Sequence, residues 1–165
     1  MFKKSTFFMR VIVVLLGLVI LIPCLLFLPR VLVLLSWVAK EILRQEDIFF
    51  WILDGLIYVA LYLALIPFLM AIYQTLKLLG YIDKKETFSE KTVKALKVIR
   101  NCATAILVIF IVGAMPTAIY NEVLEEIIMG AAISLIPMAI AVFASMLMNL
   151  IKEAIEIKSE NDLTI

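Results

Sequence analysis

The chain has 165 residues, 65% of them hydrophobic, and a formal net charge of +1. A soluble domain usually contains about 45–50% apolar residues, and a chain of this length cannot bury so large an excess in one aqueous core, so the composition excludes an ordinary soluble domain and predicts a membrane protein. The nearly balanced charge excludes a strongly basic nucleic-acid-binding protein, and we expect no direct nucleic-acid partner.

The first predicted membrane span covers residues 11–35. Lys3, Lys4 and Arg10 precede an apolar run that is long enough to cross a bilayer. Because no small-residue cleavage site follows this run, we expect a retained helix rather than a signal peptide. Residues 31–39 either extend the helix, with a bend near Pro29, or lie in the membrane interface; we favour the bent extension.

The second predicted span covers residues 48–76 and is followed by a polar segment, residues 77–101. Within this segment, the sequence TFSE at residues 87–90 has the spacing of a capping box, with Thr87 as the N-cap and Glu90 reaching back. Apolar residues then recur at helical spacing, namely Val93, Leu96 and Ile99. The pattern predicts a short amphipathic helix that leads directly into the third span.

The third and fourth predicted spans, residues 102–120 and 127–151, are separated by a short acidic turn, which makes them antiparallel neighbours. The last segment, residues 152–165, keeps a helical pattern at first. Its end is either disordered, as free termini often are, or ordered by pairing with another part of the chain or with a partner. The predicted fold class is all-α, with four transmembrane helices and a short cytoplasmic amphipathic helix between the second and third, in one domain over residues 1–165.

Basic residues predict the orientation, because lysine and arginine in short loops stay on the cytoplasmic side. Most of them lie before residue 11, within residues 77–101 or after residue 151, and the turn between the third and fourth spans has none. We therefore expect a multi-pass protein of the bacterial inner membrane, with both termini and the 77–101 loop in the cytoplasm.

Asp54 is the only carboxylate that lies clearly within a predicted span. An ionisable group in the membrane is costly unless it is paired, so such a residue is a functional candidate. Arg30 should lie at a similar depth on the first span. A structural ion pair between Arg30 and Asp54 is one interpretation, and a ligand-binding or proton-binding role of Asp54 is the other.

Five lysines make residues 77–101 basic. They suit two roles, binding of anionic lipid headgroups and docking of a soluble partner, although the orientation alone already requires such a cluster. The five are Lys84, Lys85, Lys91, Lys94 and Lys97.

The sequence has no pattern typical of a catalytic or metal-binding site. It contains no histidine, the commonest metal ligand and proton shuttle. Its two cysteines, Cys24 and Cys102, lie in or at the edge of different apolar runs, and we interpret them as packing residues rather than a disulfide. We expect neither an enzyme nor a cofactor.

With these features the chain resembles the bacterial membrane proteins of domain-of-unknown-function family 2975. The resemblance rests on the four spans, on TFSE at residues 87–90 followed by Val93 and Leu96, and above all on the closing sequence ENDLTI at residues 160–165. It covers nearly the whole chain and carries over no catalytic residues. Members of the family are often encoded beside a small helix-turn-helix regulator, so the resemblance implies a membrane partner for such a regulator.

Two functional hypotheses follow. The leading one is a non-enzymatic membrane module that senses or sequesters a cytoplasmic DNA-binding regulator, which it holds with the basic loop and with C-terminal residues that include Asn161, Asp162 and Leu163. A polar tail that ends in Leu-Thr-Ile is poorly suited to lipid and too apolar for a merely solubilising tail. The alternative is a small transporter or channel component that works as a homo-oligomer and uses Asp54.

Overall fold

A computed structural model describes residues 2–41, 48–84, 86–120 and 124–163 of the chain. These residues form four helices and contain no strand: α1 (Phe2–Glu41), α2 (Ile48–Asp83), α3 (Glu90–Tyr120) and α4 (Leu124–Leu163). Each helix contains a stretch that is long and apolar enough to cross a membrane. The all-α fold with four transmembrane helices is therefore confirmed.

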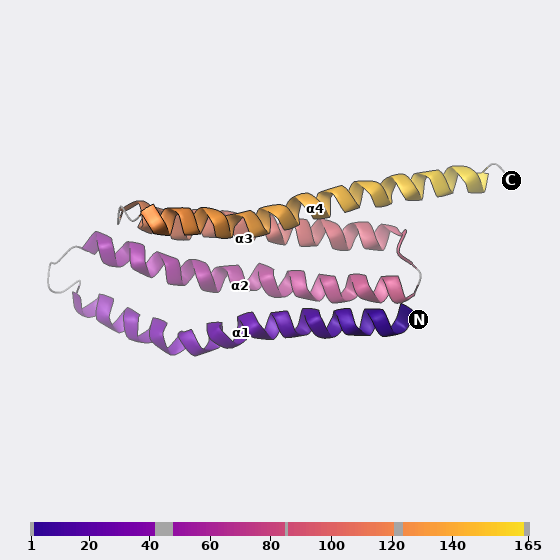
Figure 1. The fold of residues 1–165 in the computed structure, drawn as a ribbon. Coiled ribbons are helices and arrows are strands. Elements are labelled where there is room, and N and C mark those ends of the chain that lie inside the picture. Colours follow the sequence, from indigo (N-terminus) through magenta and orange to yellow (C-terminus); the bar gives the residue numbers. More distant parts are fainter. Residues whose placement is uncertain (1, 42–47, 85, 121–123, 164–165) are drawn as a thin grey trace.

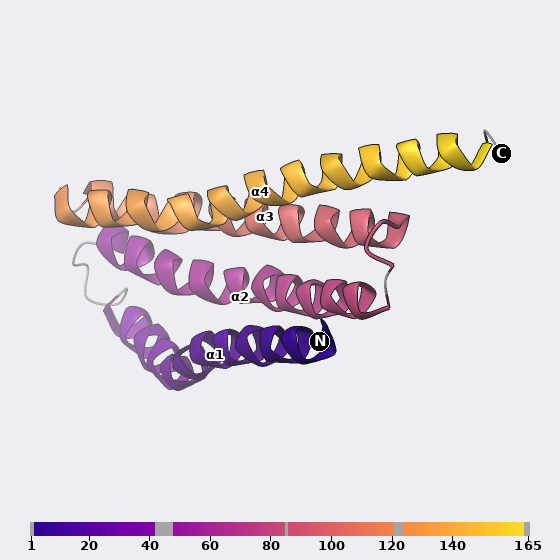
Figure 2. The same cartoon turned by 45° about the vertical axis from the view of Figure 1, so that its right-hand side comes forward.

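The four helices lie in a row, in the order of the sequence (Figure 1). α1 packs on α2, α2 on α3 and α3 on α4, each pair antiparallel, and among the described residues no other two helices are in contact. Both ends of the chain therefore lie at the same end of the row (Figures 1 and 2). The predicted antiparallel pairing of the last two helices is confirmed.

The helices extend beyond the predicted spans. α1 continues through residues 31–39 to Glu41 and bends part-way along its length, as expected for a helix that contains Pro23 and Pro29 (Figure 2). α2 continues to Asp83 and α3 begins at Glu90, so residues 84–89 alone connect them and most of the expected 77–101 loop is helical. The predicted amphipathic segment forms the first part of α3. The same helix continues from it into the third apolar span, as predicted. The depths at which the helices enter the membrane stay a prediction.

Ser89, not Thr87, is the N-cap of α3. The backbone N–H of Thr92 donates to the side-chain oxygen of Ser89 at 3.4 Å and to the Ser89 carbonyl at 3.0 Å. The Thr92 hydroxyl donates to the carbonyl of Glu86 at 3.2 Å, and Thr92 is only 1% exposed. The predicted N-cap, Thr87, is therefore wrong by two residues. The buried Thr92 bonds to the carbonyl of Glu86, and this contact fixes the connection and the first turn of α3.

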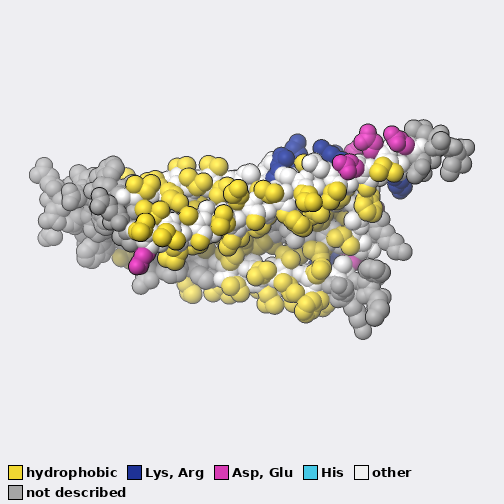
Figure 3. All heavy atoms as spheres, turned by 45° about the horizontal axis from the view of Figure 1, so that its top comes forward, with side chains coloured by type: hydrophobic (Ala, Val, Ile, Leu, Met, Phe, Trp, Pro, Cys, Tyr) yellow, Lys and Arg dark blue, Asp and Glu magenta, His cyan; other side chains and the backbone are white. Residues whose placement is uncertain are grey.

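Small residues lie where the helices approach most closely. Ala95, Ala103, Ala141 and Ala144 are buried, whereas large apolar side chains cover the outward surface (Figure 3). A Cβ atom added to Gly113 in α3 would collide with the Cβ of Ala60 in α2. Lipid is as apolar as leucine, so close backbone approach and van der Waals contact hold membrane helices together. Small residues inside and large ones outside suit a row of helices in a bilayer.

Gly113→Ala should destabilise the protein, because the added methyl group forces α2 and α3 apart. We expect a loss of about 1–3 kcal/mol in unfolding free energy, measured as a lower thermal midpoint in detergent. Gly55→Ala is the matched control, since nothing lies within 4 Å of a Cβ added to Gly55, and its midpoint should stay unchanged or rise slightly. Equal midpoints for the two variants would contradict the close contact at Gly113.

Candidate functional site at the polar end of the helix row

Charged side chains gather at one end of the helix row, which we call the polar end: the start of α1, the end of α2, the connection from residue 84 to 89, the start of α3 and the end of α4. Lysine and arginine lie beside the start of the projecting part of α4, and acidic side chains follow along it (Figure 3). At the other end, Glu125 is the one charged residue whose side chain is described. The polar end is therefore the candidate site for contacts with water, headgroups or proteins.

An ion pair joins α1 to α2 at this end. Nη2 of Arg10 lies 2.6 Å from Oδ2 of Asp83, and the two side chains are 43% and 20% exposed. The guanidinium passes close to Gly80, with Nη2 3.8 Å from the place where a Cβ would lie, and its Nε is buried without a hydrogen-bond partner. Sequence reasoning missed this pair because its members are 73 positions apart. The sequence did contain one signal for this pair: Arg10 and Asp83 each lie next to an apolar run, and their helices are antiparallel neighbours.

The predicted Arg30–Asp54 pair stays a prediction. Arg30 belongs to α1 and Asp54 to α2, but both lie outside the residues whose side chains the structure describes. Elsewhere on this pair of helices the hydroxyl of Tyr62 in α2 donates to the backbone carbonyl of Cys24 in α1 at 3.0 Å. This bond joins α2 to the backbone of α1.

The lysines of the expected basic cluster have different surroundings in the structure. Lys84, Lys91, Lys94 and Lys97 are all exposed, and Lys91 lies 3.6 Å from Glu86 in an exposed ion pair. Lys94 lines a groove. Lys85 lies outside the described residues.

The groove that Lys94 lines runs between the start of α3 and the end of α4 and has a volume of about 320 Å³. Val93 and Ile155 are its apolar lining residues, and both are half-buried. The charged lining residues are Glu90, Lys94, Lys152 and Glu156. We call it the charged groove.

The C-terminal segment, whose first part was expected to keep a helical pattern, is a continuation of α4, which ends at Leu163. We call residues 152–163 the α4 arm. α4 has 40 residues and α3 has 31, so at about 1.5 Å per residue α4 is longer by roughly 14 Å. The arm projects past the start of α3 (Figures 1 and 2). Asn161, Asp162 and Leu163 lie in the last turn of this helix, and their side chains are outside the described set.

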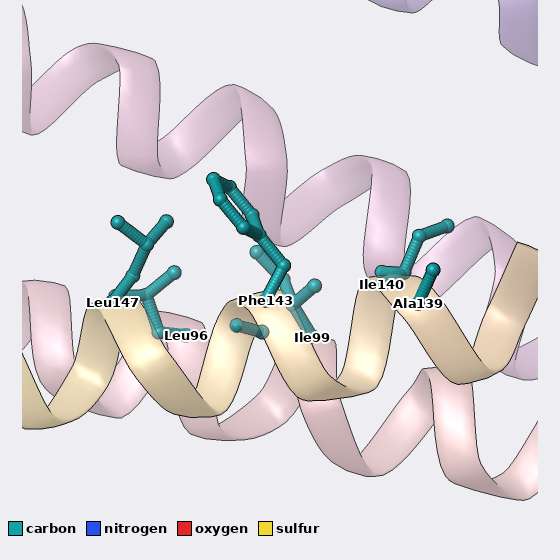
Figure 4. Close-up of a pocket in the computed structure, with 7 residues that line it drawn as sticks. Leu96, Ile99, Ala139, Ile140, Phe143 and Leu147 are labelled. Atoms are coloured by element: carbon teal, nitrogen blue, oxygen red, sulfur yellow. The ribbon is translucent and has the colours of Figure 1, made fainter.

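A second groove between α3 and α4 is purely apolar (Figure 4). It has a volume of about 450 Å³ and is formed by Leu96 and Ile99 of α3 and by five residues of α4: Ala139, Ile140, Phe143, Ala144 and Leu147. None of these side chains has a polar atom, so the groove provides room for hydrocarbon and no group for catalysis.

Metal-ligating and nucleophilic groups are scattered. Among the described residues, no three histidine, cysteine, aspartate or glutamate side chains lie close enough together to hold a metal ion. Cys24 in α1 and Cys102 in α3 are free and buried, so they fill space between helices as expected of packing residues.

Comparison with known proteins assigns the chain to a family. Residues 48–165 match the family model described as a protein of unknown function, DUF2975. The chain belongs to this family. It is also 38% identical, over 99% of both chains, to the uncharacterized membrane protein YoaS of Bacillus subtilis (strain 168), so it is a membrane protein with a bacterial relative. No solved structure matches it significantly.

The DUF2975 match begins at the first residue of α2. The matched part of the chain is therefore the unit of α2, α3 and α4, whereas the alignment with YoaS includes α1 as well. The resemblance read from residues 87–90 and from the closing sequence is confirmed. The Arg10–Asp83 pair ties α1 to this unit.

The Arg10–Asp83 pair should show a small positive coupling in a double-mutant cycle with Arg10→Gln and Asp83→Asn. Because Arg10 is partly solvated, we expect about 0.5–1 kcal/mol of coupling in thermal stability in detergent. The exposed Lys91–Glu86 pair, at 3.6 Å, is the matched control and should show less coupling. A coupling for Arg10 and Asp83 no larger than that of the control would contradict the expected contribution of the pair to the attachment of α1.

Proposed function

We propose that this protein is a non-enzymatic membrane module that holds a cytoplasmic helix-turn-helix regulator on its α4 arm. The observation that carries the proposal is the arm itself, a helix of charged and apolar residues that continues out of a membrane span and projects past the helix beside it. In this proposal the protein lies in the bacterial inner membrane, and the polar end faces the cytoplasm.

The orientation is supported by the distribution of basic residues. Lysine and arginine are concentrated on the elements that form the polar end, and the rule that such residues stay inside the cell applies to short connections of this kind. Both termini then lie in the cytoplasm, because the start of α1 and the end of α4 share this end.

The surface of the α4 arm is too polar for the hydrocarbon of the bilayer and is suited to a protein. Four of its residues are acidic and two are basic, which gives a net charge of −2: Glu153, Glu156, Glu160 and Asp162 against Lys152 and Lys158. Glu153 and Glu160 are seven residues apart, so they share one face of the helix, and both are exposed. Ile157 is 60% exposed and offers an apolar contact between these charges.

A helix-turn-helix protein is a suitable occupant because its DNA-binding surface is basic. An acidic helix can attract that surface and steer its approach by complementary charge. The family resemblance implies the same class of partner. Binding to the arm would keep the regulator at the membrane and cover the surface with which it contacts DNA.

The orientation is tested by labelling intact cells with a membrane-impermeant maleimide. In a background with Cys24→Ala and Cys102→Ala, Lys84→Cys should be labelled only after the cells are opened, because residue 84 lies at the polar end. Glu125→Cys is the matched position at the other end and should be labelled in intact cells. The reverse pattern would invert the proposed orientation.

The partner is tested by measuring binding between the full-length protein in detergent and a purified small helix-turn-helix regulator of the same organism. We expect binding at low salt that weakens as salt is raised, and severalfold weaker binding to the variant Glu153→Gln with Glu160→Gln. Glu86→Gln with Glu125→Gln removes the same charge away from the arm and should leave binding unchanged. Deletion of residues 160–165 should also weaken it.

Two outcomes would contradict the proposal. If the intact protein fails to bind the regulator at any salt concentration, the protein is not its membrane partner. If binding survives both the neutralised arm and the deletion, the partner is held somewhere other than the arm.

A further inference from the structure

The charged groove has two chemically different rims. α3 runs away from the polar end and α4 runs toward it. Glu90 and Lys94 are four positions apart on α3, and Lys152 and Glu156 are four positions apart on α4, so each lysine lies about 6 Å deeper than the glutamate on its own helix. All four side chains line the same groove. Its basic rim therefore faces the membrane spans, and its acidic rim faces the tip of the α4 arm.

These four charges do not neutralise one another. Oppositely charged residues four apart on a helix usually interact, yet within the described part of the chain the ion pairs are Arg10–Asp83 and Lys91–Glu86, and none involves a residue of the groove. The four side chains are exposed. The groove thus presents two cations and two anions to a space of about 320 Å³.

The lining between the rims is apolar. Val93 on α3 and Ile155 on α4 are half-buried and line the groove between the charged residues. A ligand that fits must therefore carry a negative group on the membrane side, a positive group on the arm side and an aliphatic link between them.

We propose that the charged groove binds the zwitterionic phosphoethanolamine headgroup of a membrane lipid. Its phosphate would accept charge-assisted hydrogen bonds from Lys94 and Lys152, and its ammonium would donate to the carboxylates of Glu90 and Glu156. The two methylene groups between phosphate and ammonium lie over Val93 and Ile155. The phosphate is bonded to the glycerol that carries the acyl chains, so it enters on the membrane side, where the basic rim lies.

The acidic rim makes the site selective. A phosphoglycerol headgroup satisfies the two lysines but brings no cation for Glu90 and Glu156, and its negative charge is repelled by them. An ordinary basic surface has the opposite preference, because it attracts anionic lipids with each lysine and has nothing to reject them. The order of lipid preference therefore distinguishes this site from a basic patch.

The site does not depend on the proposed regulator. Its charged residues are Glu90, Lys94, Lys152 and Glu156, whereas the arm is tested through Glu153 and Glu160, which do not line the groove. Lipid binding by the groove can therefore fail while regulator binding by the arm remains, and the reverse is also possible.

The experiment measures lipid retention by the full-length protein in detergent. Dioleoyl-phosphatidylethanolamine and dioleoyl-phosphatidylglycerol are added at equal concentration, and bound lipid is counted by native mass spectrometry. The wild-type protein should retain the ethanolamine lipid in preference. Lys94→Gln with Lys152→Gln should lower retention of both lipids by about tenfold or more. Glu90→Gln with Glu156→Gln should lower retention of the ethanolamine lipid alone and so remove the preference.

Matched variants separate the groove from general charge effects. Lys91→Gln with Lys97→Gln removes two exposed lysines of α3 that do not line the groove, and Glu153→Gln with Glu160→Gln removes two carboxylates of the arm; both should keep the wild-type preference. Equal or better retention of the glycerol lipid by the wild-type protein overturns the proposal even if a variant fails to fold. The proposal is also overturned if the preference for the ethanolamine lipid survives in Glu90→Gln with Glu156→Gln. It is overturned as well if Lys91→Gln with Lys97→Gln loses this preference to the same extent as the groove variants.

Discussion

The structure depends on close approach between backbones, because lipid provides little hydrophobic force to drive one helix onto another. Gly113 in α3 shows the constraint most clearly, since a single methyl group there would meet Ala60 of α2. Gly17 plays the same part between α1 and α2, where an added Cβ would lie 2.9 Å from the Cδ1 of Ile72. Most large apolar side chains are consequently exposed, and each helix packs only on its neighbours in sequence within the described regions.

A row of helices has consequences that a closed bundle would not have. In a bundle the first and last helices would meet, whereas here α1 contacts α2 alone and α4 contacts α3 alone among the described residues. α4 is thus free to diverge from its neighbour and to continue as the α4 arm (Figure 2). The divergence creates the charged groove, whose sides are α3 and α4. The same packing rule that orders the membrane spans therefore exposes the polar surface on which both proposals rest.

Hydropathy predicted the four helices because a long apolar run in lipid must form a helix to satisfy its own backbone. It could not locate the start of α3, where Thr87 and Ser89 are both suitable caps and burial of Thr92 decides between them. Depth arguments suggested Arg30 and Asp54, whose side chains the structure does not describe, and missed Arg10 with Asp83, whose pairing depends on how α1 and α2 are aligned. Lys94 was included in a basic cluster, but its role in the groove depends on the course of α4, which the sequence of α3 does not contain.

The proposed lipid site and the proposed partner site are adjacent on α4, so a lipid bound at the first can fix the position of the second. Lys152 and Glu156 line the charged groove, while Glu153 lies between them in the sequence but outside the groove and Glu160 lies one turn further along the arm. A headgroup bound between α3 and α4 would hold the base of the arm by charge at the membrane surface. The acidic face would then keep a fixed height above the bilayer. A regulator held there would stay close to the membrane, which itself carries negative charge, and DNA would be repelled from the same space. Lipid recognition at the base of the arm thus strengthens the sequestering role proposed for its outer part.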